Sequence, residues 1–285
     1  MTSPRPLVTH VSDTARWVAA RRAAESARPD ALFHDPLADR LAGERGREIA
    51  AAAGQKLDDD WFFVTRTKLI DDQIVAAVAA GCDAVLNLGA GLDTRPYRMH
   101  LPAELRWIEA DLPGLIAEKN TLLAAETPGC GLTRTAIDLT DPEALAALLD
   151  TALADTRQAL VITEGLLMYL PESDVIALSK AFTRPEIAGW CLELSTPGVA
   201  KLMADRKVGL LEQSPMRFLP ADGIGFFETH GWTVEYLEPI AAGANRFGRL
   251  TSPQHRAALD GPQPDPRAPG EWPYTAVTRL GHRSA

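Results

Sequence analysis

The chain has 285 residues, of which 46% are hydrophobic and 24% charged, so it can bury the core of an ordinary globular fold. Its formal net charge is −9, and an acidic surface repels phosphate backbones, so we expect no nucleic-acid partner. The N-terminus lacks the apolar stretch of a secretory signal, and no apolar run reaches the ~20 residues that span a bilayer. These features predict a cytoplasmic protein that does not associate with membranes.

The first 80 residues predict three helices. Ser12 and Asp13 are expected to cap the first, which runs through Trp17. A second helix is expected over 37–53 and a third over 60–80, where apolar residues recur at helical spacing.

From residue 84 onward, strand and helix patterns alternate. Short apolar runs predict strands at 84–88, 106–111, 132–137, 159–163 and 190–194, and helical patterns lie between them at 112–125, 142–154 and 172–182. This alternation indicates right-handed βαβ units. We therefore predict an α/β fold with a doubly wound, mostly parallel, Rossmann-like sheet of seven strands, the last two lying nearer the C-terminus.

The alternation of strand and helix patterns is less regular after residue 195. The patterns predict a helix at 199–211, a helix at 222–230, a strand at 232–237, a Pro-rich loop at 261–273 and a strand at 274–280. Because the chain has no internal repeat and no flexible interdomain linker, we expect a single domain over 1–285. Its parts would be N-terminal helices (1–80), a cofactor-binding core (81–196), a lid insertion (197–220) and a C-terminal helix with strands (221–285).

A glycine loop follows the first predicted strand. Gly89 and Gly91 stand in G-x-G spacing, and glycine allows the backbone to approach a ligand closely. Asp111 ends the next strand, where a carboxylate can accept hydrogen bonds from both hydroxyls of a ribose. Asp111 could also cap the helix that follows, and the two roles are compatible. The pattern predicts a nucleotide-type cofactor at this sheet edge.

The residues after the glycine loop bear on which cofactor binds. Thr94 occupies the position of the third glycine in a dinucleotide-binding loop, and the carboxylate of Asp93 beside it would repel a pyrophosphate. S-adenosylmethionine contains a ribose but no phosphate, and its methionine end carries an ammonium. The loop therefore favours an S-adenosylmethionine-dependent methyltransferase. An NAD(P)-dependent oxidoreductase and a non-catalytic cofactor-binding protein remain the alternatives.

Several segments together resemble a known family. They are NLGAGLDTR at 87–95, IEADLPGLIAEK at 108–119, AIDL at 136–139 and ITEGLLMYLPE at 162–172, with further similarity at 12–26, 33–43 and 64–72. These motifs resemble the leucine carboxyl methyltransferase-like family, in particular the bacterial branch that includes the O-methyltransferase of tetracenomycin polyketide biosynthesis. The eukaryotic members methylate a protein C-terminus, a role for which this chain offers no recognisable feature.

The resemblance implies a set of cofactor contacts. Gly89 and Gly91 would line the methionine end, and Asp111 would hold the ribose. Asp138 and Leu139 would frame the adenine, with Asp138 accepting a hydrogen bond from its exocyclic amine.

Two further residues are implied on the methionine side. Glu164 would lie close to the methionine moiety, and Arg66 would pair with its carboxylate, because a guanidinium binds a carboxylate through two hydrogen bonds. The alternative for Arg66 is a solvated helix face. No metal site is expected, since Cys82, Cys130 and Cys191 form no C-x-x-C pair and are expected to be buried thiols.

The acceptor is expected to be a small hydrophobic metabolite, polyketide-like, methylated on a hydroxyl or a carboxylate. A hydroxyl needs a base and a carboxylate does not. His34 and His230 are expected to be surface or capping residues, and Tyr169 to contact either the acceptor or the core, so no base is assigned. The segments 12–53 and 197–220 are expected to cover the cofactor. The sequence does not predict the oligomeric state.

Overall fold

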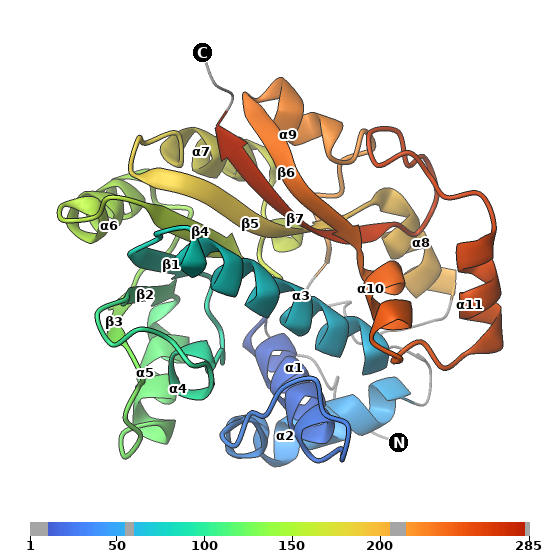
Figure 1. Ribbon diagram of the computed structural model, residues 1–285, viewed down its shortest axis with the longest axis horizontal. Helices are drawn as coiled ribbons and strands as arrows, with labels where there is room; N and C mark the ends of the chain where they lie inside the picture. The colour runs from blue at the N-terminus through green and yellow to red at the C-terminus, as the bar shows by residue number, and fades with distance from the viewer. Residues whose placement is uncertain (1–10, 55–59, 206–214, 283–285) are drawn as a thin grey trace, which may run out of the picture.

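The computed structural model describes residues 11–54, 60–205 and 215–282. Within these ranges seven strands form one sheet in the order β3-β2-β1-β4-β5-β7-β6 (Figure 1). The strands are β1 Ala84–Leu88, β2 Arg106–Asp111, β3 Gly131–Ala136, β4 Ala159–Thr163, β5 Ile187–Ser195, β6 Trp232–Pro239 and β7 Thr275–His282. All neighbours pair in parallel except that β7 runs antiparallel to β5 and β6. The predicted fold class is confirmed.

The order of the strands reverses between β1 and β4. β1 leads outward through β2 to β3, and β4 leads outward in the other direction through β5. Both central strands are buried along their whole length, which explains their continuous apolar sequences. In such sheets a crevice opens at the carboxyl ends of the strands where the order reverses, and ligands bind there.

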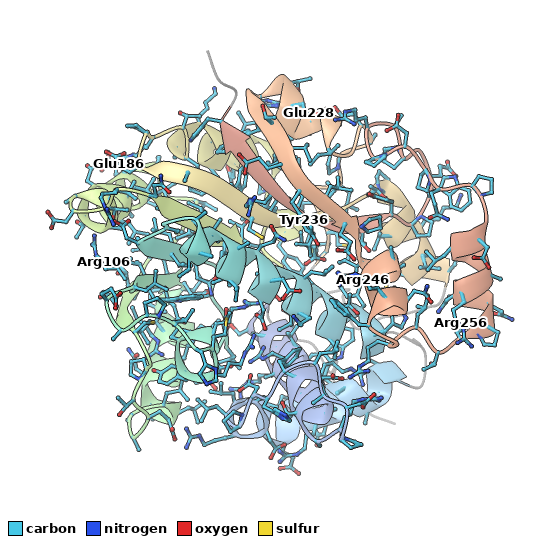
Figure 2. All side chains as sticks on the ribbon, in the orientation of Figure 1. Arg106, Glu186, Glu228, Tyr236, Arg246 and Arg256 are labelled. Carbon is cyan, nitrogen blue, oxygen red and sulfur yellow. The ribbon has the colours of Figure 1, made fainter. Side chains whose placement is uncertain are left out.

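Helices cover both faces of the sheet. One face packs against α6 (Pro142–Leu153), α7 (Glu172–Ala181) and α9 (Gly225–Thr229), and the other against α3 (Asp60–Ala79) and α10 (Ile240–Arg246). Side chains alternate between the faces along each strand, so Val85 packs towards α3 while Leu86 packs towards α6. Charged side chains such as Arg106 and Arg256 lie at the periphery (Figure 2).

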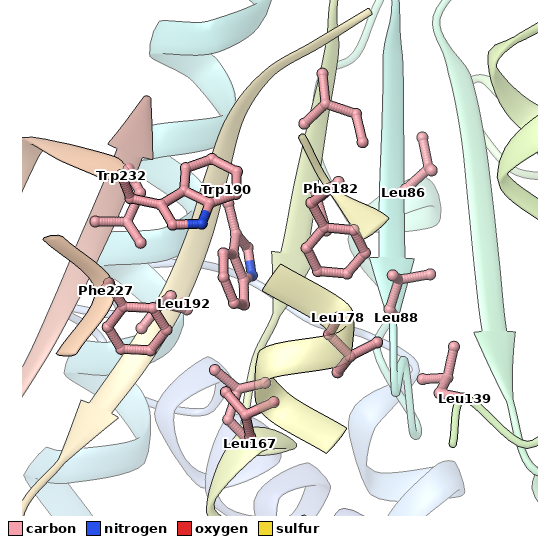
Figure 3. Packing of buried hydrophobic residues seen from close by; sticks show 14 of the residues in the cluster. Leu86, Leu88, Leu139, Leu167, Leu178, Phe182, Trp190, Leu192, Phe227 and Trp232 are labelled. Carbon is pink, nitrogen blue, oxygen red and sulfur yellow. The ribbon is translucent and has the colours of Figure 1, made fainter. Parts of the chain in front are cut away.

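Aromatic rings close the α7 and α9 side of the core (Figure 3). The ring of Trp190 contacts those of Phe182, Phe227 and Trp232 edge to face, with centroids 5.1 to 5.3 Å apart. Both indole nitrogens have partners, since Trp190 donates to Thr163 and Trp232 donates to a serine on α7. This packing joins the antiparallel end of the sheet to its parallel part.

The N-terminal helices form a layer beside α3. α1 (Val11–Ser26) packs along α2 (Ala38–Gly54), and α1 also contacts α3. A Cβ at Gly46 of α2 would lie 2.5 Å from the carbonyl oxygen of Arg16, so the two helices can approach this closely only with glycine there. The position of α1, which borders the site described below, depends on this contact.

Several element predictions need correction. Ser12 and Asp13 lie inside the first turn of α1 and not at its cap, and β5 begins before the expected residue 190. The helix expected at 199–211 is α8 (Pro197–Asp205), and residues 206–211 lie outside the described ranges. The sequence patterns did not predict α4 (Arg95–Arg98), α10 and α11 (Pro253–Asp260), which are too short to show a clear helical repeat.

We predict that Gly46→Ala destabilises the fold by about 1–3 kcal/mol, because the added methyl group must push α1 and α2 apart. This loss should exceed the ~1 kcal/mol gain in helix propensity. Urea denaturation measures the change. Gly114→Ala in α5 (Pro113–Leu122) is the matched control, because its Cβ meets nothing within 4 Å, and it should leave stability unchanged or raise it. Equal midpoints for both variants would contradict the close-contact argument.

Candidate functional site

A cavity of about 660 Å³ lies at the carboxyl ends of the strands. Its walls come from the loops after β1, β2, β3 and β4, the end of β5, and the helices α1, α3 and α8. All of the predicted cofactor residues line it: Arg66, Gly89, Gly91, Asp111, Asp138, Leu139 and Glu164. The structure thus brings the predicted set together, and the contact that each makes with a cofactor stays a prediction.

A hydrogen bond connects the glycine loop to Asp111. Gly89 and Gly91 have φ angles of 71° and 50°, which side chains rarely allow. The Asp111 carboxylate accepts 2.7 Å hydrogen bonds from the backbone N–H groups of Gly91 and Leu112. Burial nevertheless raises the pKa of Asp111. Leu112, and not Asp111, is the N-cap residue of α5, so the capping alternative for Asp111 is wrong.

The loop after β3 forms the far end of the cavity. Asp138 Oδ1 accepts hydrogen bonds from the backbone N–H and the hydroxyl of Thr140, and these hold the pKa of Asp138 below its usual value. Leu139 is buried and packs into the core. An ionised carboxylate beside an apolar side chain is suited to an adenine, which has a polar edge and apolar faces.

Arg66 is buried and bound to two carboxylates. Its side chain is 5% exposed, so the solvated helix face that the sequence left open is wrong. Nε donates to Glu164 Oε1 at 2.9 Å, and Nη1 donates to Glu193 Oε2 at 2.5 Å. The guanidinium also lies 5.8 Å and 5.4 Å from the ring centroids of Phe62 and Phe63. Arg66 therefore joins β4 and β5 to α3 at the cavity wall.

Arg95 is a second buried cation that the sequence analysis did not assign to the site. Its Nη1 donates to Asp93 at 2.6 Å and to Glu164 at 2.8 Å, and its Nε donates to Asp71 at 2.7 Å. Burial opposes ionisation of Asp93, but the positive charges around it, of which Arg95 is the strongest, together outweigh burial and hold the pKa of Asp93 well below its usual range. The signal in the sequence was the arginine two residues after Asp93 in the glycine loop.

Together these groups form a buried ionic cluster with more carboxylates than cations. Its members are Asp71, Asp93, Glu164 and Glu193 with Arg66, Arg95 and Arg98. When all are ionised the net charge is −1, from four negative and three positive groups. The methionine part of S-adenosylmethionine carries an ammonium, a sulfonium and a carboxylate, with a net charge of +1. The cluster therefore complements this cofactor in charge.

A second part of the cavity wall, the apolar wall, is largely aromatic and adjoins the ionic cluster where Arg66 lies near Phe62 and Phe63. It contains Trp17, Trp61, Phe62, Phe63, Val199, Leu202, Met203 and Met216. The rings of Trp17 on α1 and Phe63 on α3 pack edge to face with centroids 5.0 Å apart, and Met203 of α8 packs against the same group. Both the 12–53 and the 197–220 segments thus contribute side chains to the cavity, and their closure over a bound cofactor stays a prediction.

The candidate bases differ in whether they line the cavity. His34 is exposed, and neither it nor His230 lines the cavity. His230 ends α9, where its Nδ1 lies 2.7 Å from the carbonyl oxygen of Phe226, as expected of a capping histidine. Tyr169 does line the cavity, and burial raises its pKa to about 12. A tyrosine with so high a pKa is a poor proton acceptor near neutral pH.

The structure also bears on the expectations about metal sites, membrane spans and cysteines. Over residues 11–54, 60–205 and 215–282 no three metal-binding side chains come together. Across the same described part of the chain, no helix combines the length and apolar character needed to cross a bilayer. Cys82, Cys130 and Cys191 are free and buried, as predicted.

The sheet order, with one antiparallel strand inserted beside the last parallel one, defines the class I methyltransferase fold. Two solved structures share it. A DUF574 family protein from Streptomyces avermitilis superposes with a TM-score of 0.62 at 14% identity, over 98% of this chain and 99% of that one. A provisionally assigned methyltransferase from Thermobifida fusca superposes with a TM-score of 0.61 at 16% identity, over the full length of both.

Sequence comparison identifies the family. The model of the leucine carboxyl methyltransferase family matches residues 15–183, more than half of the chain. A Streptomyces coelicolor protein, provisionally named an S-adenosyl-L-methionine-dependent methyltransferase, is 35% identical over 266 residues, covering 87% of this chain and 92% of its own length. A Streptomyces avermitilis protein with the same provisional description is 33% identical over 264 residues, with the same coverage. The chain belongs to the leucine carboxyl methyltransferase family.

Family membership confirms the resemblance seen in the sequence motifs. The protein is an S-adenosylmethionine-dependent methyltransferase, and the oxidoreductase alternative is disfavoured. The charge of the cluster and the two positive-φ glycines fit the same cofactor.

We predict that Asp111→Ala weakens binding of S-adenosylhomocysteine at least ~100-fold, because two hydrogen bonds from the ribose to a carboxylate, each worth about 1.5–3 kcal/mol, are lost. Isothermal titration calorimetry measures the dissociation constant. Asp155→Ala, at an exposed position outside the cavity, is the control and should bind normally. An unchanged dissociation constant in a folded Asp111→Ala protein would remove Asp111 from the site.

We also predict that Arg95→Leu lowers the free energy of unfolding by about 3–5 kcal/mol, because Asp71, Asp93 and Glu164 lose their shared cation while buried. The control is Arg157→Leu, whose side chain is 84% exposed and pairs only with a surface carboxylate, and which should cost less than ~1 kcal/mol. Chemical denaturation compares the two. Similar losses would mean that the cluster contributes no more than a surface ion pair.

Proposed function

We propose that the protein transfers the methyl group of S-adenosylmethionine to an oxygen of a small hydrophobic acceptor of polyketide-like, aromatic character. The observation that supports this proposal is the division of one cavity into two walls. The charged wall carries the predicted cofactor residues, and the apolar wall carries aromatic and aliphatic side chains from α1, α3 and α8. An apolar compartment beside a methyl donor favours an apolar acceptor.

The proposed reaction requires the protein mainly to position the cofactor and the acceptor. S-adenosylmethionine supplies an already activated methyl group when it is bound. Arg66 would hold the methionine carboxylate, Asp111 the ribose, and Asp138 with Leu139 the adenine. The aromatic wall would hold the acceptor in line and exclude water from the reacting atoms.

The oxygen acceptor could be a hydroxyl or a carboxylate, and both are small enough for this compartment. A protein C-terminus is a less suitable acceptor. The apolar wall consists mainly of aromatic rings and methionines, and it offers few polar groups to a peptide backbone. A flat, apolar ring system with one oxygen substituent could pack its ring against the aromatic side chains of this wall.

The test is transfer of radiolabel from methyl-labelled S-adenosylmethionine to a panel of phenols, enols and carboxylic acids on aromatic frameworks. We expect label in at least one aromatic oxygen acceptor, with S-adenosylhomocysteine as coproduct. Tight binding of S-adenosylhomocysteine without transfer to any acceptor would favour a non-catalytic binding protein. Tight binding of NADH, with none of S-adenosylhomocysteine, would favour the oxidoreductase.

A further inference from the structure

The predicted cofactor residues follow the strand order along the sheet edge. Asp138 lies after β3, Asp111 ends β2, Gly89 follows β1 and Glu164 follows β4. Neighbouring strands are about 4.8 Å apart, so a cofactor whose adenine lies at β3 would reach β4 with its methionine end. The next position along the edge is β5, which carries Glu193. A cofactor placed in this way would carry its methyl group near this strand.

Glu193 is a charged residue inside an otherwise apolar buried strand. Its side chain is 1% exposed and lines the cavity. Oε2 accepts the 2.5 Å hydrogen bond from Arg66, and the backbone N–H of Gly165 also lies close to this carboxylate. Oε1 is buried, and no donor among the described residues meets hydrogen-bond geometry with it. In Glu164, by contrast, each oxygen accepts from an arginine. A buried carboxylate oxygen without a donor costs free energy, so Glu193 Oε1 is suited to a donor on a ligand.

The surroundings of Glu193 belong to the acceptor side of the cavity. Ser195 projects from the same face of β5 two residues on, and Thr275 of β7 pairs with it in the sheet. Both line the cavity, as does Tyr169. Arg66 connects Glu193 to the aromatic wall, because its guanidinium lies over Phe62 and Phe63. A ring placed against this wall could direct a substituent at Glu193.

We propose that Glu193 Oε1 accepts the hydrogen bond of an aromatic hydroxyl on the acceptor and takes its proton during methyl transfer. This inference rests on the proposed function and specifies its substrate class. The methyl–sulfur bond breaks and its electron pair stays on sulfur, which becomes a neutral thioether. The methyl–oxygen bond forms from a lone pair of the hydroxyl, and the hydroxyl proton moves to Glu193, leaving a neutral methyl ether and a neutral carboxylic acid.

Charge at the site disfavours the carboxylate alternative. A carboxylate acceptor would bring a further negative charge next to Glu193 and Glu164, and the proposed function already assigns Arg66 to the methionine carboxylate. The desolvation that raises the pKa of Glu193 makes this carboxyl a better proton acceptor than an exposed one. An aromatic hydroxyl supplies the donor that Oε1 lacks, and a carboxylate supplies only more negative charge.

The experiment compares the wild-type protein with Glu193→Gln and Glu186→Gln. Glu186 precedes the amino end of β5, away from the cavity, and so provides the same substitution beside the same strand (Figure 2). Each protein is saturated with S-adenosylhomocysteine and titrated calorimetrically near neutral pH with 2-naphthol and with 2-naphthoate. The rate of methyl transfer to 2-naphthol, and to a nitro-substituted naphthol that is already ionised, is measured with labelled S-adenosylmethionine.

We expect the wild-type complex and the Glu186→Gln complex to bind 2-naphthol at least ~10-fold more tightly than 2-naphthoate. Glu193→Gln should abolish this preference while changing the affinity for S-adenosylhomocysteine less than ~3-fold. It should slow methylation of 2-naphthol at least ~100-fold and methylation of the ionised naphthol far less, because the latter has no proton to lose. A purely structural role would slow both equally.

Three results of the binding measurements would overturn the inference. One is a wild-type preference for 2-naphthoate, and another is no binding of either compound at millimolar concentration. The third is weaker binding of S-adenosylhomocysteine to Glu193→Gln with an unchanged naphthol preference, which would assign Glu193 to the cofactor ammonium. Methylation of carboxylic acids alone would refute this inference and leave the proposed O-methyl transfer standing, whereas absence of transfer to every oxygen acceptor would refute both.

Discussion

The site depends on one buried interaction, the sharing of Glu164 between Arg66 and Arg95. Arg66 comes from α3, Arg95 from the glycine loop and Glu164 from the loop after β4, so the shared carboxylate ties three separate segments together at the sheet edge. Removing any member would leave an uncompensated charge in a dry environment, which is more costly than the original burial of the pair. All three residues line the cavity, so this interaction fixes part of its wall where the strand order reverses.

The same cluster sets the electrostatics of the cavity. Its carboxylates outnumber its guanidinium groups by one, and the arginines hold the pKa values of Asp93 and Glu164 below their usual range against the effect of burial. Burial raises the pKa of Glu193, so the net charge of −1 holds only while Glu193 is ionised. In that state a cationic sulfonium cofactor would be stabilised there more than its neutral product, and the excess charge would favour product release. The apolar wall excludes water, and this strengthens the electrostatic interactions of these charges.

Local patterns predicted the centre of the fold well. The largely apolar runs of β1 and β4 reflect burial on both faces, and the structure has these strands and β2 at the predicted residues. Gly89 and Gly91 were recognisable because a tight turn after a strand requires positive φ angles. By contrast, α10 was not predicted, because a helix of seven residues shows no clear repeat and depends on contacts distant in sequence. α11 was missed although Ser252 caps it and Pro253 begins it, two signals that the sequence contains. Glu193 went unnoticed because its partner, Arg66, lies on a distant helix.

The sequence by itself determined the fold class, the glycine loop with its carboxylate at Asp111, and the family. Each of these is encoded in residues that lie close together along the chain, where periodicity and spacing act directly. Only the tertiary structure decided that Arg66 is buried against Glu164 and Glu193, and that one oxygen of Glu193 lacks a donor. Those contacts join residues 98 and 127 positions apart, and strand order, which no local pattern records, brings them together.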